Sequence, residues 1–305
     1  MTNRKQNSPD MDLAGAACGS AALLYLVCKL VLNWFVSLLL SARVPGASLS
    51  NPAGMDLVGS ALLRLLTSAL ALAAPFLLLS RIPLSGHLPL QKGQWKFGPR
   101  LFLLFWAAML AGNLLSPIIA ASERSAPALS SLPVSGLPLV TAWMAACLLP
   151  AVGEELLFRG LMQGWLRPYG FWSAVLGQAV LFSLLHGRLS VCVPALLGGI
   201  VLGLCAEISG SLRMGMLFHL YNNSFAFLDQ YASQFWQPQT KVWLDLCLFL
   251  LPPLLLLAVQ LHRHSHPGRM LPQKQPSPAW LLRCPGWLIP AAMLLVLSIT
   301  QSYFR

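Results

Sequence analysis

Long apolar runs recur along the whole chain and constrain its fold more than any other feature of the sequence. Most of the nine runs approach or exceed the length of about 18 residues that suggests a membrane-spanning helix. Only 10% of the 305 residues are charged, against about 25% in a typical soluble protein. Water therefore cannot be the main solvent of this chain, and the runs predict one membrane domain rather than two soluble domains.

The positions of the runs predict an all-α, polytopic transmembrane helix bundle with eight or nine spans. We divide the chain into a polar tail (1–12), N-terminal transmembrane helices (13–137), a helical core (138–232) and C-terminal transmembrane helices with a basic loop (233–305). The fifth and sixth runs are short and Pro285 and Pro290 interrupt the last, so eight spans remain an alternative. The apolar runs cover 13–42, 57–80, 101–121, 138–160, 171–187, 191–208, 212–232, 242–261 and 279–300.

Basic residues set the expected orientation in the lipid bilayer. Lys and Arg concentrate in the polar tail and in alternate loops, whereas the loops 43–56 and 122–137 carry one positive charge each, offset by Asp56 and Glu123. Since basic loops stay in the cytoplasm, the N-terminus is expected there. The net charge of +11 does not indicate nucleic-acid binding, because the basic residues form no patch and no nucleic-acid-binding motif is present.

Two adjacent acids, Glu154 and Glu155, stand out among the nine acidic residues of the chain. Neighbours on a helix point about 100° apart, so the two carboxylates cannot face one cavity equally. Glu155 and Arg159 are four residues apart and can form an ion pair, which leaves Glu154 without a local partner. Glu154 is then a general-base candidate in a wet cavity. Alternatively, the charges simply mark the hydrated end of the fourth span.

Two further pairs at helical spacing follow. Phe182 precedes His186 by four residues, so ring packing can fix the imidazole. His219 and Asn223 project from one face of the seventh span. An imidazole and an amide stacked in this way can both donate hydrogen bonds to an oxygen that becomes negative, or they can form a polar seam between helices.

The three patterns, in this order on successive helices, resemble the CPBP family of intramembrane proteases, also called the Abi or type II CAAX prenyl protease family. They read EExxxR (Glu154, Glu155, Arg159), FxxxH (Phe182, His186) and HxxxN (His219, Asn223). The resemblance covers about residues 138–232. It implies that Glu154 activates water, that His186 binds or orients this water, and that His219 and Asn223 stabilise the oxyanion. Glu155 and Arg159 support the site.

Members of this family have been described both as metalloproteases and as metal-free glutamate proteases. Zinc is therefore an alternative, with Glu154, His186 and His219 as its three protein ligands. We expect no metal or other cofactor, because the zinc-binding HExxH pattern is absent and Glu154 as a ligand leaves no free acid as the base. Asn223 also suits an oxyanion better than zinc.

Simple topology does not bring these residues together. With a fourth span that ends near residue 160, Glu154 lies near the cytoplasmic end, and a rise of about 1.5 Å per residue places it about 20 Å from His186 along the membrane normal. Either the fourth helix is long and tilted, or the stretch 160–172 enters the membrane before the fifth span begins. The position of Glu154 also predicts a site that opens toward the cytoplasm.

The sequence thus predicts an intramembrane endopeptidase in a bacterial cell membrane. Its substrate is expected to be a membrane-associated or lipidated peptide or protein, either prenylated or a small peptide precursor. A membrane scaffold or regulator of the same family and a proton-coupled transporter are the alternatives. No matching halves are visible in the sequence, which argues against a transporter.

Overall fold

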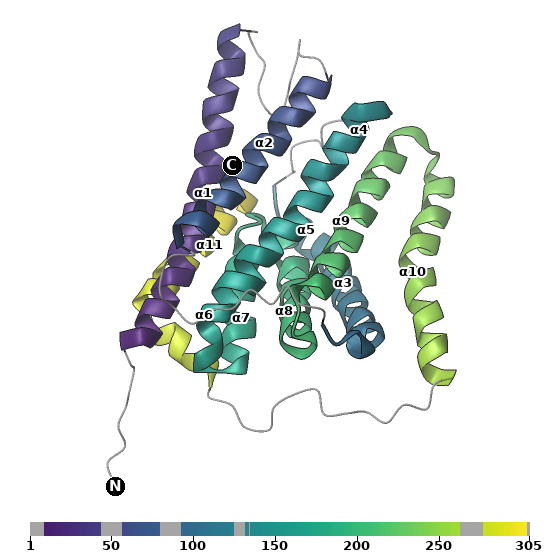
Figure 1. The fold of residues 1–305 in the computed structure, drawn as a ribbon. Coiled ribbons are helices and arrows are strands. Elements are labelled where there is room, and N and C mark those ends of the chain that lie inside the picture. Colours follow the sequence, from purple (N-terminus) through teal and green to yellow (C-terminus); the bar gives the residue numbers. More distant parts are fainter. Residues whose placement is uncertain are drawn as a thin grey trace.

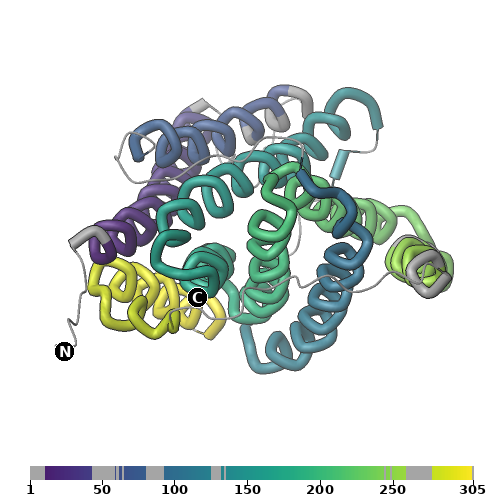
Figure 2. Tube along the Cα trace, turned by 60° about the horizontal axis from the view of Figure 1, so that its bottom comes forward, coloured from purple at the N-terminus to yellow at the C-terminus, as the bar shows by residue number. Residues whose placement is uncertain are grey.

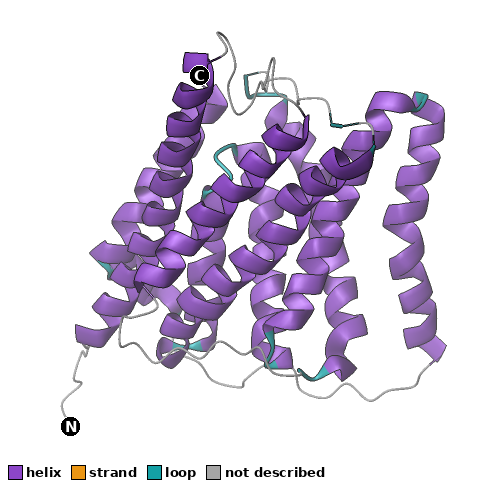
Figure 3. Ribbon diagram, turned by 45° about the horizontal axis from the view of Figure 1, so that its top comes forward, coloured by secondary structure: helices purple, strands orange, loops and turns teal. Residues whose placement is uncertain are grey.

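A computed structural model describes residues 9–43, 57–79, 93–124, 132–133, 135–262 and 277–303. Every regular element in these ranges is a helix (Figure 3). The all-α prediction is therefore confirmed for the described part of the chain.

A helix is present at each of the nine predicted apolar runs. The single helices are α1 (Pro9–Arg43), α2 (Leu57–Leu79), α3 (Gly98–Ala120), α7 (Phe171–Leu184), α8 (Leu189–Ser209), α9 (Leu212–Phe235), α10 (Pro238–His262) and α11 (Pro285–Tyr303). The short 3₁₀ turns η1 (Trp95–Phe97) and η5 (Pro278–Arg283) precede α3 and α11. Between α3 and α7 lies a continuous helical rod, made of α4 (Gly136–Trp143), η2 (Met144–Leu148), α5 (Leu149–Glu154), η3 (Glu155–Met162), α6 (Gln163–Leu166) and η4 (Arg167–Tyr169).

Six helical segments of the described chain are long and apolar enough to cross a membrane, so the chain is an integral membrane protein. The six segments are α1, η1 with α3, the rod, α8, α10 and α11. Part of α2 and all of α7 form shorter apolar helices, and α9 carries the polar run from Tyr221 to Ser224. The predicted count of eight or nine spans is not confirmed.

The described basic residues divide between the two ends of the bundle, with Arg43 at the end of α1 and Arg124 after the end of α3. Successive helices run in alternating directions, so α1, α3, α9 and α11 begin at the same end (Figure 1). We call this end the basic end and the opposite end the far end. Arg188 and Lys241 lie toward the far end. There, Glu123 pairs with Arg188, and Asp229 and Asp245 pair with Lys241. The basic end is marked by Lys96, Arg100, Arg167, Arg213 and Arg283.

The rod corrects the predicted boundary of the fourth span. The helix does not end at residue 160 but continues to Tyr169, and Gly170 ends it with a φ of 128° that favours glycine. Glu154 consequently lies near the middle of the 34-residue rod rather than near its cytoplasmic end. A π-helical turn begins directly after Glu154, and such turns are frequent at functional sites.

Helix α7 is too short to cross the bundle. Its 14 residues span about 21 Å, whereas the hydrocarbon core of a bilayer is about 30 Å thick. The turn 185–188 therefore lies part-way through the bundle, and His186 is within it. Because the rod is long and α7 is short, Glu154 and His186 lie at similar depths in the bundle. The separation of about 20 Å along the membrane normal, which counting residues predicts, is therefore wrong. Of the two alternatives, the long fourth helix is the correct one.

Glu123 holds this turn in place. Its carboxylate accepts hydrogen bonds from the Ser190 backbone (2.9 Å) and hydroxyl (2.7 Å), from the Ser302 hydroxyl (2.8 Å) and from the Arg188 guanidinium (2.9 Å). One side chain thus joins the end of α3 to the start of α8 and the end of α11. Burial opposes the charged form, but the hydrogen bonds from Ser190, Ser302 and Arg188 outweigh it and lower the pKa of Glu123 to about 2.

This lowered pKa predicts a specific acid sensitivity. A carboxylate whose pKa falls on folding stabilises the protein above its ordinary pKa, here 4.5, and loses that contribution as the pH falls toward 2. The shift corresponds to about 3 kcal/mol of unfolding free energy. We expect Glu123→Gln to lower the melting temperature in detergent at pH 7, and to lose less stability than the wild type between pH 5 and pH 3. Parallel melting curves of the two proteins across this range contradict the expectation.

Small residues bring α1 into contact with the rod and with α11. Gly19 of α1 faces Gly286 and Pro290 of α11 so closely that an added Cβ would overlap them. The buried face of α1 comprises Ala14, Ala17, Cys18, Ala21, Ala22 and Tyr25. It shares one hydrophobic core with Leu157, Phe158, Leu161, Met162 and Trp165 of the rod. Close backbone approach through small residues is the usual way in which membrane helices associate.

Helix α10 stands at the edge of the bundle (Figure 2). Pro253 has no N–H, so the carbonyl of Phe249, four residues earlier, lacks its helical partner. Trp106 Nε1 of α3 donates a hydrogen bond of 2.8 Å to this oxygen, and the Trp106 and Phe249 rings pack 5.6 Å apart. Phe249 also packs against Phe225 of α9 at 5.3 Å. These contacts fasten α10 over the side of α3 and α9.

Candidate active site

The ion pair that the spacing of Glu155 and Arg159 predicts is present. Arg159 NH1 lies 2.9 Å from Glu155 Oε1, and both side chains are fully buried. The Arg159 guanidinium also lies over the Phe182 ring, 4.2 Å from its centre, and donates to the Gly199 carbonyl at 3.4 Å. Arg159 thus links the rod to α7 and α8 while it compensates the charge of Glu155.

Glu155 has a second partner that the sequence analysis did not foresee. His219 Nδ1 lies 3.0 Å from the same Glu155 Oε1. A carboxylate that pairs with arginine accepts hydrogen bonds only, so His219 Nδ1 carries the proton. Gly215, one turn before His219, lets α9 approach, because a Cβ there would lie 2.8 Å from Glu155 Oε2. Glu155 therefore orients His219 in addition to pairing with Arg159.

The sequence analysis gives Glu154 no local partner, and the structure adds partners from other helices. Tyr25 of α1 donates its hydroxyl to Glu154 Oε1 at 3.2 Å. Glu154 Oε2 faces His219 Nε2 at 3.8 Å, which is too long for a direct hydrogen bond. One carboxylate oxygen is thus occupied, and the other remains available to a small molecule such as water. The Glu154 side chain keeps 15% of its surface exposed, whereas that of Glu155 is fully buried.

Sequence reasoning missed Tyr25, which lies 129 residues before Glu154 in the chain. A signal does exist: Tyr25 and Lys29 are a polar pair at helical spacing within an otherwise apolar span. The Lys29 ammonium lies over the Tyr25 ring, 5.9 Å from its centre.

Phe182 fixes two imidazoles at once. Its ring packs edge-on against His186 at 5.0 Å and against His219 at 6.0 Å. His186 Nδ1 lies 3.0 Å from the Phe182 carbonyl, which can only accept, so Nδ1 is the donor and His186 Nε2 keeps a free lone pair. The predicted packing of Phe182 on His186 is therefore present, and Phe182 also connects the second motif to the third.

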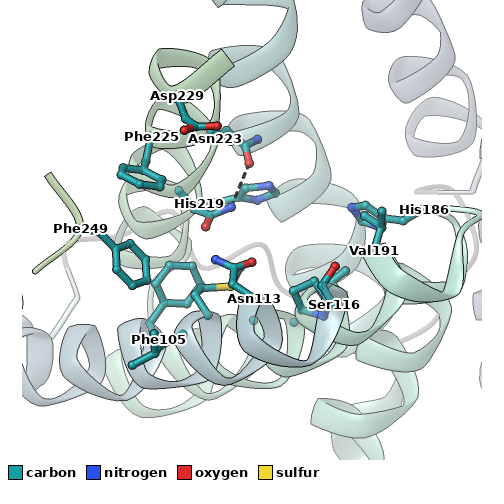
Figure 4. A pocket seen from close by; sticks show the side chains of 18 of the residues that line it. Phe105, Asn113, Ser116, His186, Val191, His219, Asn223, Phe225, Asp229 and Phe249 are labelled. Carbon is teal, nitrogen blue, oxygen red and sulfur yellow. Dashed lines mark hydrogen bonds between the residues drawn. The ribbon is translucent and has the colours of Figure 1, made fainter. Parts of the chain in front are cut away.

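A cavity of about 800 Å³ lies between α3, α7, α8, α9 and α10 (Figure 4). His186, His219 and Asn223 line it together with polar groups of α3, namely Asn113 and Ser116. Asn223 Oδ1 accepts a weak hydrogen bond from Asn222 at 3.4 Å, which leaves the Asn223 NH₂ group available. Apolar side chains complete the wall, including Phe105, Met109, Phe225 and Phe249.

The motif residues thus fall into two groups. Glu154, Glu155, Arg159 and His219 form one connected cluster. His186 and Asn223 share the cavity wall with His219 but make no direct hydrogen bond to Glu154, which lies behind His219 and does not line the cavity. His219 is the residue common to both groups.

The alternative zinc site is not assembled by these side chains. The hydrogen bonds of His219 Nδ1 and His186 Nδ1 leave Nε2 of each ring free, an arrangement that is by itself compatible with zinc binding. Within the described ranges, no three side chains of His, Cys, Asp or Glu gather closely enough to hold a metal ion. The residues present therefore do not fit the ligand set Glu154, His186 and His219 in this conformation.

The cavity extends toward the far end of the bundle. On that side its wall reaches Ser116 near the end of α3 and Val191 near the start of α8, whereas toward the basic end it stops at Phe105, Leu202 and His219. The prediction of an opening on the cytoplasmic side rested on Glu154 lying near the end of its span. The continued rod removes that premise.

Thiol labelling from the two sides of the membrane tests this geometry. We expect cysteines at Ser116, in the cavity wall, and at Lys96, exposed at the basic end, to react with an impermeant maleimide from opposite sides. Intact cells and inverted vesicles present the two sides, and peptide mass spectrometry separates the new cysteine from the seven native ones. Reaction of Ser116→Cys and Lys96→Cys from the same side places the opening at the basic end instead.

Comparison with known protein families supports the reading of the motifs. Residues 136–225 match the family described as type II CAAX prenyl endopeptidase Rce1-like. This match confirms the resemblance to the CPBP family that the three motifs indicate. It covers the rod, α7, α8 and part of α9, and it contains all seven motif residues. No curated protein and no solved structure matches the chain.

Proposed function

We propose, from the similarity of residues 136–225 to type II CAAX prenyl endopeptidases, that this chain is an intramembrane endopeptidase that uses Glu154 as its base. The observation that carries the proposal is the position of His219. Its Nδ1 is held by Glu155, and its Nε2 is directed at the open oxygen of Glu154 while the ring lines the cavity. One positioned imidazole thus connects an acid with a chamber for a substrate.

The proposed reaction begins with a water molecule at Glu154 Oε2. Glu154 takes a proton from this water as its oxygen attacks the carbonyl carbon of the scissile peptide bond. His186, through its free Nε2, helps to hold the water on the cavity side. The former carbonyl oxygen becomes an oxyanion, which the Asn223 NH₂ group stabilises together with His219 when His219 Nε2 also carries a proton to donate. The C–N bond then breaks, and the proton on Glu154 passes to the leaving amine.

The cavity sets limits on the substrate. Its volume of about 800 Å³ and its aromatic wall suit an extended apolar peptide or a peptide that carries a lipid. Both a prenylated C-terminus and a small membrane peptide precursor meet this description. Asn113 and Ser116 offer hydrogen bonds to a peptide backbone on the α3 side of the chamber.

The proposal is tested by reconstitution of the purified chain into liposomes with a panel of peptides. The panel contains a farnesylated CAAX peptide, the same peptide without the lipid, and a set of apolar membrane-inserted peptides, with products identified by mass spectrometry. We expect cleavage of at least one lipidated or membrane-inserted peptide at a defined bond. Intact peptides throughout, from a well-folded protein, contradict the endopeptidase and favour the scaffold alternative.

A further inference from the structure

The first helix lies outside the segment that matches the family, yet it contacts the proposed base directly. The match begins at residue 136, and Tyr25 of α1 donates a hydrogen bond to Glu154 Oε1. We propose that Tyr25 is a positioning residue of the active site, which holds the Glu154 carboxylate so that Oε2 alone is presented to water. This inference rests on the proposed function and extends it to a helix that no motif covers.

The Tyr25 ring is held on more than one side. Only 7% of Tyr25 is exposed, and its ring packs edge-on against Phe158 at 6.4 Å. Phe158 in turn packs against Phe182 at 5.1 Å, which connects the position of Tyr25 to the ring between the two imidazoles. The phenol is therefore part of the same packed cluster as the motif residues.

The hydrogen bond distinguishes the two oxygens of Glu154. Without a donor on Oε1, the carboxylate can rotate about its last torsion, which has a broad energy minimum. With Tyr25 in place, Oε1 is fixed, and Oε2 faces His219 Nε2 at 3.8 Å. Catalysis is sensitive to such placement, because displacement by about 1 Å can cost about 100-fold in rate.

Lys29 completes this face of α1. It lies one helical turn beyond Tyr25, in the middle of a 32-residue apolar span, where a charge is costly unless it serves a purpose. Its ammonium group lies over the Tyr25 ring, and this places a positive charge beside the phenol that touches Glu154. A cation at a ring face helps to hold the ring. The Lys29 side chain is otherwise exposed at the surface of α1.

Replacement of Tyr25 by analogues tests the hydrogen bond apart from the shape of the ring. In the liposome assay, we expect Tyr25→Phe to lower kcat by about 10-fold to 100-fold with KM changed by less than about twofold. We expect 4-aminophenylalanine at position 25, which keeps a donor, to recover most of the rate, and 4-methoxyphenylalanine, which has none, not to do so. Tyr303→Phe, which removes a hydroxyl bonded to Ser122 at the far end, is the matched control.

A second measurement does not depend on activity. A hydrophobic carbodiimide reacts with protonated carboxyl groups inside membranes, and the modification of Glu154 can be followed by mass spectrometry. Loss of the Tyr25 donor should speed this modification several-fold in Tyr25→Phe and leave it unchanged in Tyr303→Phe.

The two measurements separate the possible failures. Unchanged kcat in Tyr25→Phe, in a wild type that cleaves peptides, overturns the positioning role and leaves the proposed function intact. Equal recovery of kcat by the methoxy and the amino analogues also overturns the positioning role, because the shape of the side chain would then suffice without a hydrogen-bond donor. A wild type that cleaves nothing removes the proposed function and the catalytic part of this inference, and the carbodiimide rate still decides whether Tyr25 holds Glu154.

Discussion

Glu154→Gln is expected to slow peptide cleavage by about 10²-fold to 10⁴-fold, the usual cost of losing a general base. Glutamine has nearly the same shape, and its carbonyl oxygen can still accept the Tyr25 hydroxyl. The fold should therefore remain intact, because the buried charge pair next to it is untouched. The measurement is kcat in the liposome assay, with the melting temperature in detergent as the test of folding.

Glu207→Gln is the matched control for this variant. Glu207 is an acid of the same bundle, but it pairs with Arg167 at the basic end and does not line the cavity. Its replacement should leave turnover close to that of the wild type. A Glu154→Gln protein that turns over as fast as the Glu207→Gln protein removes Glu154 from the mechanism.

Arg159→Ala is expected to destabilise the fold itself, by about 3–5 kcal/mol, because it leaves the Glu155 carboxylate buried without a compensating charge. The same change removes the contacts of the guanidinium with the Phe182 ring and the Gly199 carbonyl. The measurements are the yield of monodisperse protein in detergent and its melting temperature. Arg167→Ala is the comparison, since Arg167 is 48% exposed and such pairs contribute at most about 1 kcal/mol.

A double variant separates structural support from the positioning of His219. Replacement of a buried ion pair by uncharged groups of similar size is often neutral for stability, so Glu155→Gln with Arg159→Met should fold better than Arg159→Ala alone. Cleavage should stay impaired, because His219 Nδ1 loses its carboxylate partner. An Arg159→Ala protein that is stable, abundant and inactive points instead to a direct catalytic role for Arg159.

The sequence predicted the local parts of the site well. Apolar runs located every long helix, because burial in lipid requires continuous hydrophobicity. The spacing of four residues predicted the contact between Glu155 and Arg159 and the packing of Phe182 on His186, since such residues share a helical face. Both are properties of a single helix or its end and need no knowledge of the tertiary fold.

Contacts between helices could not be predicted in this way. Gly160 and Gly164 lie within the rod and do not interrupt it, and only Gly170 ends it. Whether a glycine breaks a helix or packs within one depends on neighbours that periodicity does not reveal. The same holds for Tyr25 and for the sharing of Glu155 between Arg159 and His219.

The packing of α1 against the rod means that the catalytic motifs are not a separable module. Residues 136–225 contain every motif, but α1 supplies part of the core that holds Phe158 in place, and one oxygen of Glu154 is bonded to α1. A shortened chain that begins at α4 would expose that face of the rod to lipid and leave Glu154 without its phenol partner. In evolutionary terms, the motif-bearing helices and the first helix must be inherited together, although only the former carry a recognisable signature.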